Sequence, residues 1–321
     1  MDSHSDSRSG DLLPKGSWDC HHHIYDPHAF AYSPTRHMTV PPATVAQYVA
    51  FKKAHGIDNS VLTHGLSYGA DNTSLLAFLD GLKKADPGHC TLGVAVIDPD
   101  TTTDAELVAL RDGGVCGIRV NTYRYGALED VDRQIAVLRA HATRLQAAGE
   151  TTAGWSMAFT TTKPGNWTRL RSFVETEIAA ASVRLVTDHF ALLQLPENGS
   201  GELDLHQPGL EAIIALVRAG VLWVKLSAPY RLTKLPPSGG FADLKLLVRV
   251  LVDANPKRVI WGTDWPHTPK MQIRTPEEAL KEVPFLKVDD QLWLKTLRSW
   301  LSEDEWVDLM VNNPRELYNV A

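Results

Sequence analysis

Short apolar segments alternate with helical patterns along almost the whole of this 321-residue chain. Each stretch between two apolar segments repeats hydrophobic residues at intervals of three and four positions, as an amphipathic helix does. Eight apolar segments are found, near residues 18–25, 60–64, 91–97, 115–120, 152–159, 183–186, 221–227 and 259–264. Strands that alternate with helices form a parallel sheet that helices cover on both faces.

Repeats of this number and length predict an α/β fold in which the strands close into a (β/α)8 barrel of the TIM type. A doubly wound open sheet would alternate in the same way, but it usually carries a glycine-rich phosphate loop after its first strand, and this sequence has none there. Helical patterns within 276–318 predict extra C-terminal helices on the barrel. Residues 1–16 are polar and lack the apolar core of a secretory signal, so we expect a disordered leader before a single domain at 17–321.

Charge and composition exclude several classes of protein. The formal net charge of −6 and the isoelectric point near 6.1 argue against a nucleic-acid-binding surface. No apolar run reaches membrane-spanning length, and the three cysteines are an odd count without a CxxC motif. We therefore expect a cytoplasmic protein whose partner is a small molecule, and whose helical C-terminal tail can supply an interface for a homo-oligomer.

The densest cluster of side chains suited to catalysis is Asp19-Cys20-His21-His22-His23, in the first expected strand. Side chains alternate between the two faces of a strand, so His21 and His23 should share one face while Cys20 and His22 point to the packing side. Two imidazoles on one face can share a metal ion or hold one substrate oxygen.

Further candidates come where the other strands end, because the C-terminal ends of the strands carry the active site in such a barrel. They are Ser67 and Tyr68 after the second strand, Arg119, Tyr123 and Arg124 after the fourth, Trp155 in the fifth, His189 after the sixth, Lys225 and Arg231 at the seventh, and Asp264 and His267 at the eighth. The three arginines can form paired hydrogen bonds with carboxylates. Arg124 and Lys225 can equally be salt-bridge partners, and His267 can line the mouth or orient a loop.

Several of these segments resemble one family. The cluster at 19–23 matches the D-x-H-x-H opening of the amidohydrolase superfamily. The segment Trp261-Gly262-Thr263-Asp264-Trp265-Pro266-His267 matches the strand-eight Asp in the form typical of the amidohydrolase-2 branch, which contains the 2-pyrone-4,6-dicarboxylate lactonases. Residues 68–72, 117–121 and 225–231 look like further segments of that lactonase group.

The resemblance implies a hydrolase that opens a lactone or ester of a small carboxylated or phenolic ring compound, as in the metabolism of aromatic compounds. It implies that Asp264 is the general base that activates water, that His21, His23 and His189 polarise the carbonyl, and that arginines hold substrate carboxylates. Members of the lactonase group work without a bound metal, so no cofactor is expected.

Two departures from the group pattern keep other functions open. His189 is followed by Phe190-Ala191-Leu192-Leu193 where the group usually carries a Gly-Arg-Pro-like sequence, which favours a more apolar ring than a dicarboxylate pyrone. The fifth strand has no histidine and the fourth no evident bridging lysine, which argues against two metal ions. A single zinc on His21, His23, His189 and Asp264 is still chemically reasonable. The alternatives are therefore a zinc-dependent decarboxylase or C–C hydrolase of an aromatic acid in the same superfamily, and a non-catalytic barrel that binds such an acid.

Overall fold

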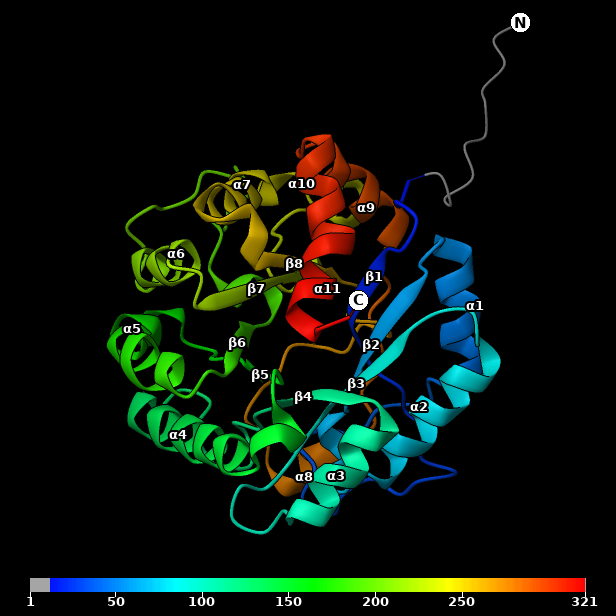
Figure 1. Ribbon diagram of the computed structural model, residues 1–321. Helices are drawn as coiled ribbons and strands as arrows, with labels where there is room; N and C mark the ends of the chain where they lie inside the picture. Colours follow the sequence, from blue (N-terminus) through cyan, green and yellow to red (C-terminus); the bar gives the residue numbers. More distant parts are fainter. Residues whose placement is uncertain (1–11, 321) are drawn as a thin grey trace, which may run out of the picture.

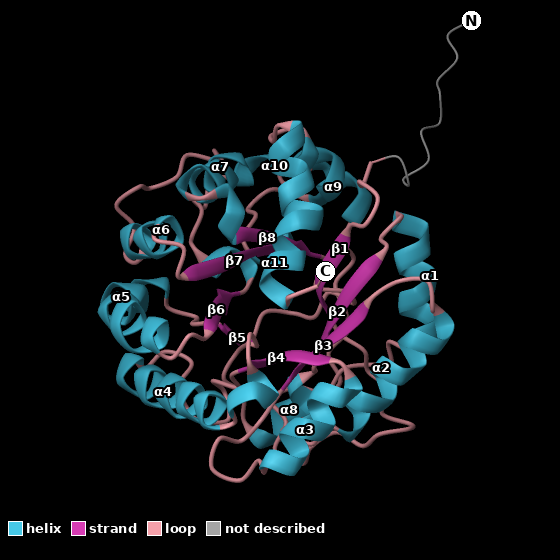
Figure 2. Ribbon diagram, viewed as in Figure 1, coloured by secondary structure: helices cyan, strands magenta, loops and turns pink. Residues whose placement is uncertain are grey.

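The computed structural model describes residues 12–320, in which eight parallel strands form one sheet in sequence order. The strands are β1 (Trp18–His22), β2 (Asn59–Thr63), β3 (Thr91–Ala95), β4 (Val115–Arg119), β5 (Ser156–Phe159), β6 (Arg184–Thr187), β7 (Leu222–Ser227) and β8 (Val259–Gly262). Figure 1 looks along the barrel axis and shows the strands encircled by helices, which Figure 2 separates by colour. The predicted (β/α)8 barrel is confirmed.

The barrel closes between its last and first strands. The backbone N–H of Asp264 donates to the His21 carbonyl at 2.7 Å, and the N–H of His23 donates to the Trp265 carbonyl at 2.8 Å. Gly262 permits this approach, since a Cβ atom there would lie 2.8 Å from the Cβ of His21. The contacts that close the barrel therefore also bring His21, His23 and Asp264 together.

One helix follows each of the first seven strands. These are α1 (Val45–His55), α2 (Thr73–Ala85), α3 (Asp104–Gly113), α4 (Val131–Ala147), α5 (Trp167–Phe173), α6 (Leu210–Arg218) and α7 (Lys245–Ala254). Local sequence defines several of their ends. Thr44 and Thr103 form capping boxes at the starts of α1 and α3, and Gly56 and Gly114 end the same helices in the left-handed conformation.

The remaining helices pack on the outside and across one end of the barrel. They are α8 (Pro276–Leu280), α9 (Asp290–Arg298), α10 (Glu303–Val307) and α11 (Asn313–Tyr318). In Figure 1, α11 crosses the end of the barrel that faces the viewer. Its Leu317 and Tyr318 pack on Trp18, Trp223 and other side chains inside the barrel near the starts of the strands. Helix α11 therefore covers the end of the barrel where the strands start, and the functional site is expected at the opposite end, where the strands finish.

The predicted leader at 1–16 lies mostly outside the described residues, but its last part belongs to the fold. Leu13 is buried, and the Leu12 carbonyl accepts a hydrogen bond from the Trp306 indole at 3.1 Å. The packed chain therefore begins by residue 12. Within the described residues, no helix has the length and apolarity needed to cross a membrane.

The attachment of the C-terminal helices to the barrel gives a pH-dependent prediction. Glu305 in α10 accepts two hydrogen bonds of 2.9 Å from Arg249 in α7, and these bonds lower the pKa of Glu305 from 4.5 to about 2. Because the folded pKa is below the unfolded one, the pair stabilises the fold fully above pH 4.5 and loses this contribution as the pH falls towards 2.

We expect Glu305→Gln to lower the free energy of unfolding at pH 7 by roughly 1 kcal/mol, as measured by urea titration. The deficit should shrink at pH 3. Glu303→Gln, an exposed residue of the same helix, is the control. An equal deficit at both pH values would contradict this account of the pair.

Candidate active site

A shift of register in β1 arranges the histidine cluster. The pairing of β1 with β2 is irregular between Asp19 and His22. Asp19 accepts a hydrogen bond from Tyr48 of α1 at 3.0 Å, and the His22 ring stacks on the same tyrosine at 3.6 Å between centroids. Cys20 lies among the side chains of the barrel interior. The prediction that His21 and His23 point away from His22 is confirmed, whereas the shared packing side predicted for Cys20 and His22 is wrong because the irregularity separates them.

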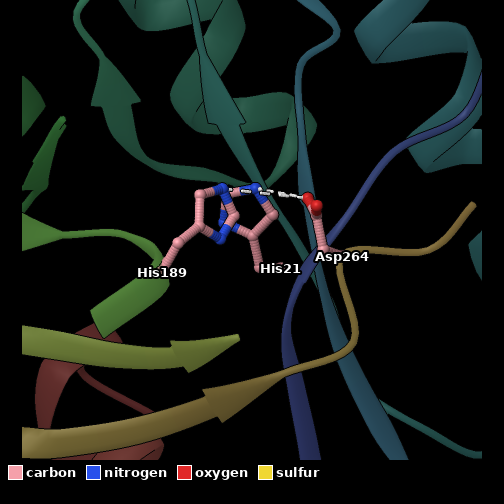
Figure 3. Close-up of side chains that lie close together, drawn as sticks. All are labelled: His21, His189 and Asp264. Carbon is pink, nitrogen blue, oxygen red and sulfur yellow. Dashed lines mark ion pairs between the residues drawn. The ribbon is translucent and has the colours of Figure 1, made fainter. Parts of the chain in front are cut away.

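Three imidazoles converge on one carboxylate oxygen. Asp264 Oδ1 lies 3.4 Å from His21 Nε2, 3.4 Å from His23 Nε2 and 4.0 Å from His189 Nε2. All four side chains are almost completely buried. Figure 3 shows His21 and His189 side by side and facing Asp264.

Unusual backbone geometry marks the strand ends that supply this cluster. His189 to Leu192 after β6 have φ angles of 52–55°, and Ala228 after β7 and Asp264 after β8 have φ angles of 51° and 61°. Residues with a Cβ atom rarely adopt this left-handed region, which costs of order 1–3 kcal/mol for each residue. Such strain typically gathers at functional sites, where it aims side chains that regular strands would point elsewhere.

The second oxygen of Asp264 is held by groups from the loop after β7. Arg231 Nη2 donates to Oδ2 at 2.7 Å, its Nε donates at 3.2 Å, and the Tyr230 hydroxyl also donates to Oδ2. Burial alone would raise the pKa of Asp264, but the positive charge of Arg231 and the neighbouring His189 hold it well below the usual range. Asp264 is therefore an anion whose Oδ2 is fully engaged and whose Oδ1 faces the histidines.

The other sides of the histidine rings are also fixed. His23 Nδ1 lies 2.7 Å from the Thr63 carbonyl, and His189 Nδ1 lies 2.9 Å from the Ser227 hydroxyl. A carbonyl oxygen only accepts, so His23 carries a proton on Nδ1. Burial and the nearby Arg231 lower the pKa of His189 to about 4, although Asp264 acts in the opposite direction. His189 is therefore neutral at neutral pH.

A cavity opens above this cluster at the C-terminal ends of the strands. Its empty space, with the open mouth included, is about 780 Å³. Its polar wall includes Arg119, Thr160, His37, His23 and His189, and its apolar wall is formed by Tyr25, Met38, Leu66, Leu128, Leu192 and Met271. His21 and Asp264 are fully buried and do not line it. Arg119 makes one long hydrogen bond of 3.3 Å, to the His64 carbonyl, and no ion pair with a carboxylate in the described part of the chain. It is therefore available to an anionic ligand.

Some residues predicted to bind substrate lie outside this cavity. Tyr68, Tyr123 and Arg124 line a neighbouring depression, and the half-exposed Arg124 pairs with Asp98 at 2.5 Å. Ser67 is buried and donates to the Met38 carbonyl at 2.7 Å.

Three further predicted contacts need correction. Trp155 precedes β5 and lies at the opposite end of the barrel, beside Val183, so it is not a wall of the site. His267 lines a depression on the outer side and binds Asp290 at 3.1 Å. Lys225 lies beneath the cluster, 3.1 Å from Asp188, rather than in the cavity wall.

No sequence pattern pointed to His37 or Thr160, or to the role of Tyr230. Tyr230 directly precedes Arg231 in a segment that the family resemblance had already singled out, so only its place near the site could be expected. His37 lies in a long loop without any recognisable pattern, and Thr160 falls one residue beyond β5.

The possible ligand atoms of the cluster lie close enough together to surround a single cation. His21 Nε2 and Asp264 Oδ1 are buried without a hydrogen-bond partner among the described residues. Ligand atoms of His21, His189 and Asp264 lie within 4.8 Å of one another, and His23 Nε2 adjoins them. Imidazole nitrogens and a carboxylate oxygen are ligands that suit zinc.

Comparisons with known proteins cover nearly the whole chain. Residues 18–320 match the model of a family described as Amidohydrolase. A 4-sulfomuconolactone hydrolase of Hydrogenophaga intermedia is 28% identical over 96% of this chain and 90% of its own. A 2-pyrone-4,6-dicarboxylate hydrolase of Comamonas testosteroni is also 28% identical, over 95% of this chain and 91% of its own. An apo structure from Agrobacterium tumefaciens superposes with a TM-score of 0.72 at 24% identity, covering 96% of this chain and 97% of its own, which supports the fold.

Proposed function

This chain belongs to the amidohydrolase family, and from that premise we propose that it opens a lactone of a small anionic ring compound with water. Two of its relatives are named as hydrolases of small anionic lactones. The chain itself is an enzyme of this lactonase-like hydrolase type. The observation that carries the proposal is one buried carboxylate oxygen facing three imidazoles, beside a cavity that holds an arginine without a carboxylate partner among residues 12–320.

Substrate binding divides between the two walls of the cavity. Arg119 binds the anionic group of the substrate, because a guanidinium offers paired donors to a carboxylate or sulfonate. Leu128, Leu192 and Met271 pack against the ring. Arg231 is already engaged by Asp264, so it supports the carboxylate and contributes less to substrate binding than predicted.

Asp264 and His23 orient the attacking water. Asp264 Oδ1 is free to accept a hydrogen bond from that water, and His23, whose Nδ1 donates to the Thr63 carbonyl, holds its Nε2 beside the same oxygen. Asp264 accepts the proton as the water oxygen bonds to the lactone carbonyl carbon. The low pKa of Asp264 makes it a weak base, so stabilisation of the oxyanion has to supply a large share of the rate.

His189 and His21 stabilise the negative charge that develops on the carbonyl oxygen. When the Ser227 hydroxyl donates to Nδ1 of His189, the proton of the neutral ring lies on Nε2 and points towards the site. One such donor typically contributes a factor of about 10²–10³. The ring then opens at the acyl–oxygen bond, and the leaving alkoxide or enolate takes up the proton that Asp264 accepted from the water.

A metal ion would be held by His21, His189 and Asp264, with His23 beside them. When bound, it would act as a Lewis acid on a substrate oxygen or lower the pKa of a bound water. This donor set is the observation that keeps a zinc-dependent decarboxylase or C–C hydrolase as the second candidate function.

Metal content and a substrate panel separate the two candidates. We expect protein purified without added metal to hydrolyse singly charged lactones, and chelator treatment to leave this activity unchanged, with the acid released followed in a pH-stat. About one equivalent of zinc, together with activity on aromatic acids that chelation removes and zinc restores, would instead support the second candidate.

We also infer that the enzyme works in the cytoplasm. Cys20, Cys90 and Cys116 are all free thiols, as is usual in a reducing compartment.

A further inference from the structure

Lys225 is a buried cation directly beneath the histidine cluster. Only 1% of its side chain is exposed. Its Nζ lies 3.2 Å from His21 Nδ1 and 3.1 Å from Asp188 Oδ1, and these two atoms are themselves 3.3 Å apart. Asp188 compensates the charge of the lysine, since a buried cation without a partner is costly. His21 thus has a cation and an anion at the same ring nitrogen, and its tautomer depends on which of them it bonds.

The geometry of these contacts indicates that His21 Nδ1 forms a hydrogen bond with Lys225 and not with Asp188. An ammonium group only donates hydrogen bonds, so a bond from Lys225 requires a lone pair on His21 Nδ1. Lys225 Nζ and His21 Nδ1 have hydrogen-bond geometry, whereas Asp188 Oδ1 has no hydrogen bond of acceptable direction within residues 12–320. A proton on Nδ1 would also face the ammonium at 3.2 Å. The neutral His21 ring therefore carries its proton on Nε2, which lies 3.4 Å from Asp264 Oδ1.

The neighbouring histidine has the opposite arrangement. The Thr63 carbonyl accepts from Nδ1 of His23, so in the singly protonated form of this ring Nε2 is an acceptor. The two histidines of the strand-one pair thus present a donor and an acceptor on either side of Asp264 Oδ1. Such a pair can hold a water or a substrate oxygen in one orientation, which two identical tautomers could not do.

We propose that Lys225 is a positioning residue that fixes His21 as a hydrogen-bond donor and thereby makes the site a poor ligand set for a divalent cation. A metal ion needs the lone pair of His21 Nε2, and freeing that lone pair moves the ring proton to Nδ1, against the ammonium of Lys225. The lysine also adds a positive charge next to the cation position. This inference concerns the protonation of the chain's own residues and holds whichever lactone is the substrate.

Two variants test it. Lys225→Met removes the ammonium at similar length, and Lys225→Met/Asp188→Asn removes both charges, so that no buried carboxylate is left unpaired if the single variant folds poorly. The matched control is Lys52→Met/Asp86→Asn, which removes another buried lysine together with its partly buried partner, 2.6 Å apart and outside the site. Circular dichroism checks that each variant is folded.

The first readout is the His21 tautomer. Long-range ¹H–¹⁵N NMR spectra of histidine-labelled protein distinguish Nδ1–H from Nε2–H rings, and the signals missing from a His21→Gln variant assign His21. We expect wild-type His21 and the control to be Nε2–H, and the double variant to lose this preference. A wild-type His21 with its proton on Nδ1 would overturn the proposal.

The second readout is metal affinity, measured by calorimetric titration with Zn²⁺ and by the visible absorption of bound Co²⁺. We expect the double variant to bind both ions about tenfold more tightly or better than the wild type, because His21 can then offer the lone pair of Nε2, and groups that bond the second nitrogen of a ligating histidine change metal affinity by about 10–100-fold. The control should match the wild type. Equal affinity in all three proteins would overturn the proposal, and because neither readout uses turnover, it can fail while the hydrolase assignment stands.

Discussion

Replacing Asp264 with asparagine is expected to reduce kcat for lactone hydrolysis by about 10²–10⁴, the usual contribution of a positioned general base. The amide keeps the size of the side chain, but it can neither take the proton from water nor balance the charge of Arg231, which lies 2.7 Å away. KM should change much less than kcat, because Arg119 and the apolar wall still bind the ring. Steady-state kinetics with a reactive lactone measures both constants.

The matched control for this substitution is Asp86→Asn. Asp86 also pairs with a buried cation, Lys52, at 2.6 Å, but it lies away from the cavity. We expect a loss of stability there and normal turnover. Normal turnover by the Asp264→Asn enzyme would remove Asp264 from the mechanism.

Replacing Arg119 with glutamine is expected to lower kcat/KM by roughly ten- to a hundredfold, mainly through KM, because hydrogen bonds to charged groups contribute about 1.5–3 kcal/mol. The effect should be largest for substrates that carry a carboxylate or sulfonate and small for neutral lactones. Kinetics on matched neutral and anionic lactones therefore isolates the contribution of the charge.

Arg124→Gln is the control for Arg119. Arg119 ends β4 and Arg124 lies in the loop after it, but Arg124 lines the neighbouring depression and is already paired with Asp98. Its loss should leave kcat/KM within about twofold of the wild type, as expected of a half-exposed ion pair. A larger effect at Arg124 than at Arg119 would mean that substrate binds in the other depression.

The sequence was informative wherever a residue's position followed from a repeating pattern. Alternating apolar and helical segments predicted the barrel, and the strand-end rule led to His21, His23, His189 and Asp264. Both inferences work because parallel strands in a closed barrel must all finish at the same end.

Other features depended on local irregularities that no repeat encodes. Strict alternation cannot reveal the register shift between Asp19 and His22, which separates Cys20 from His22. The expected fifth strand began at residue 152, whereas β5 begins at Ser156, so Trp155 was placed near the wrong end of the barrel. The pairing of Lys225 with Asp188 joins two strands through the interior, and only the three-dimensional packing reveals it.

The central claim, that water opens a lactone in this cavity, is tested most directly by turnover in H₂¹⁸O with mass spectrometry of the product. The Asp264→Asn enzyme serves as the measure of spontaneous hydrolysis. We predict that each product molecule formed by the wild-type enzyme carries one ¹⁸O atom in its new carboxylate. A ring-opened or rearranged product without ¹⁸O, or release of CO₂ from the substrate, would contradict hydrolysis and show that the cluster of His21, His23, His189 and Asp264 performs a different reaction.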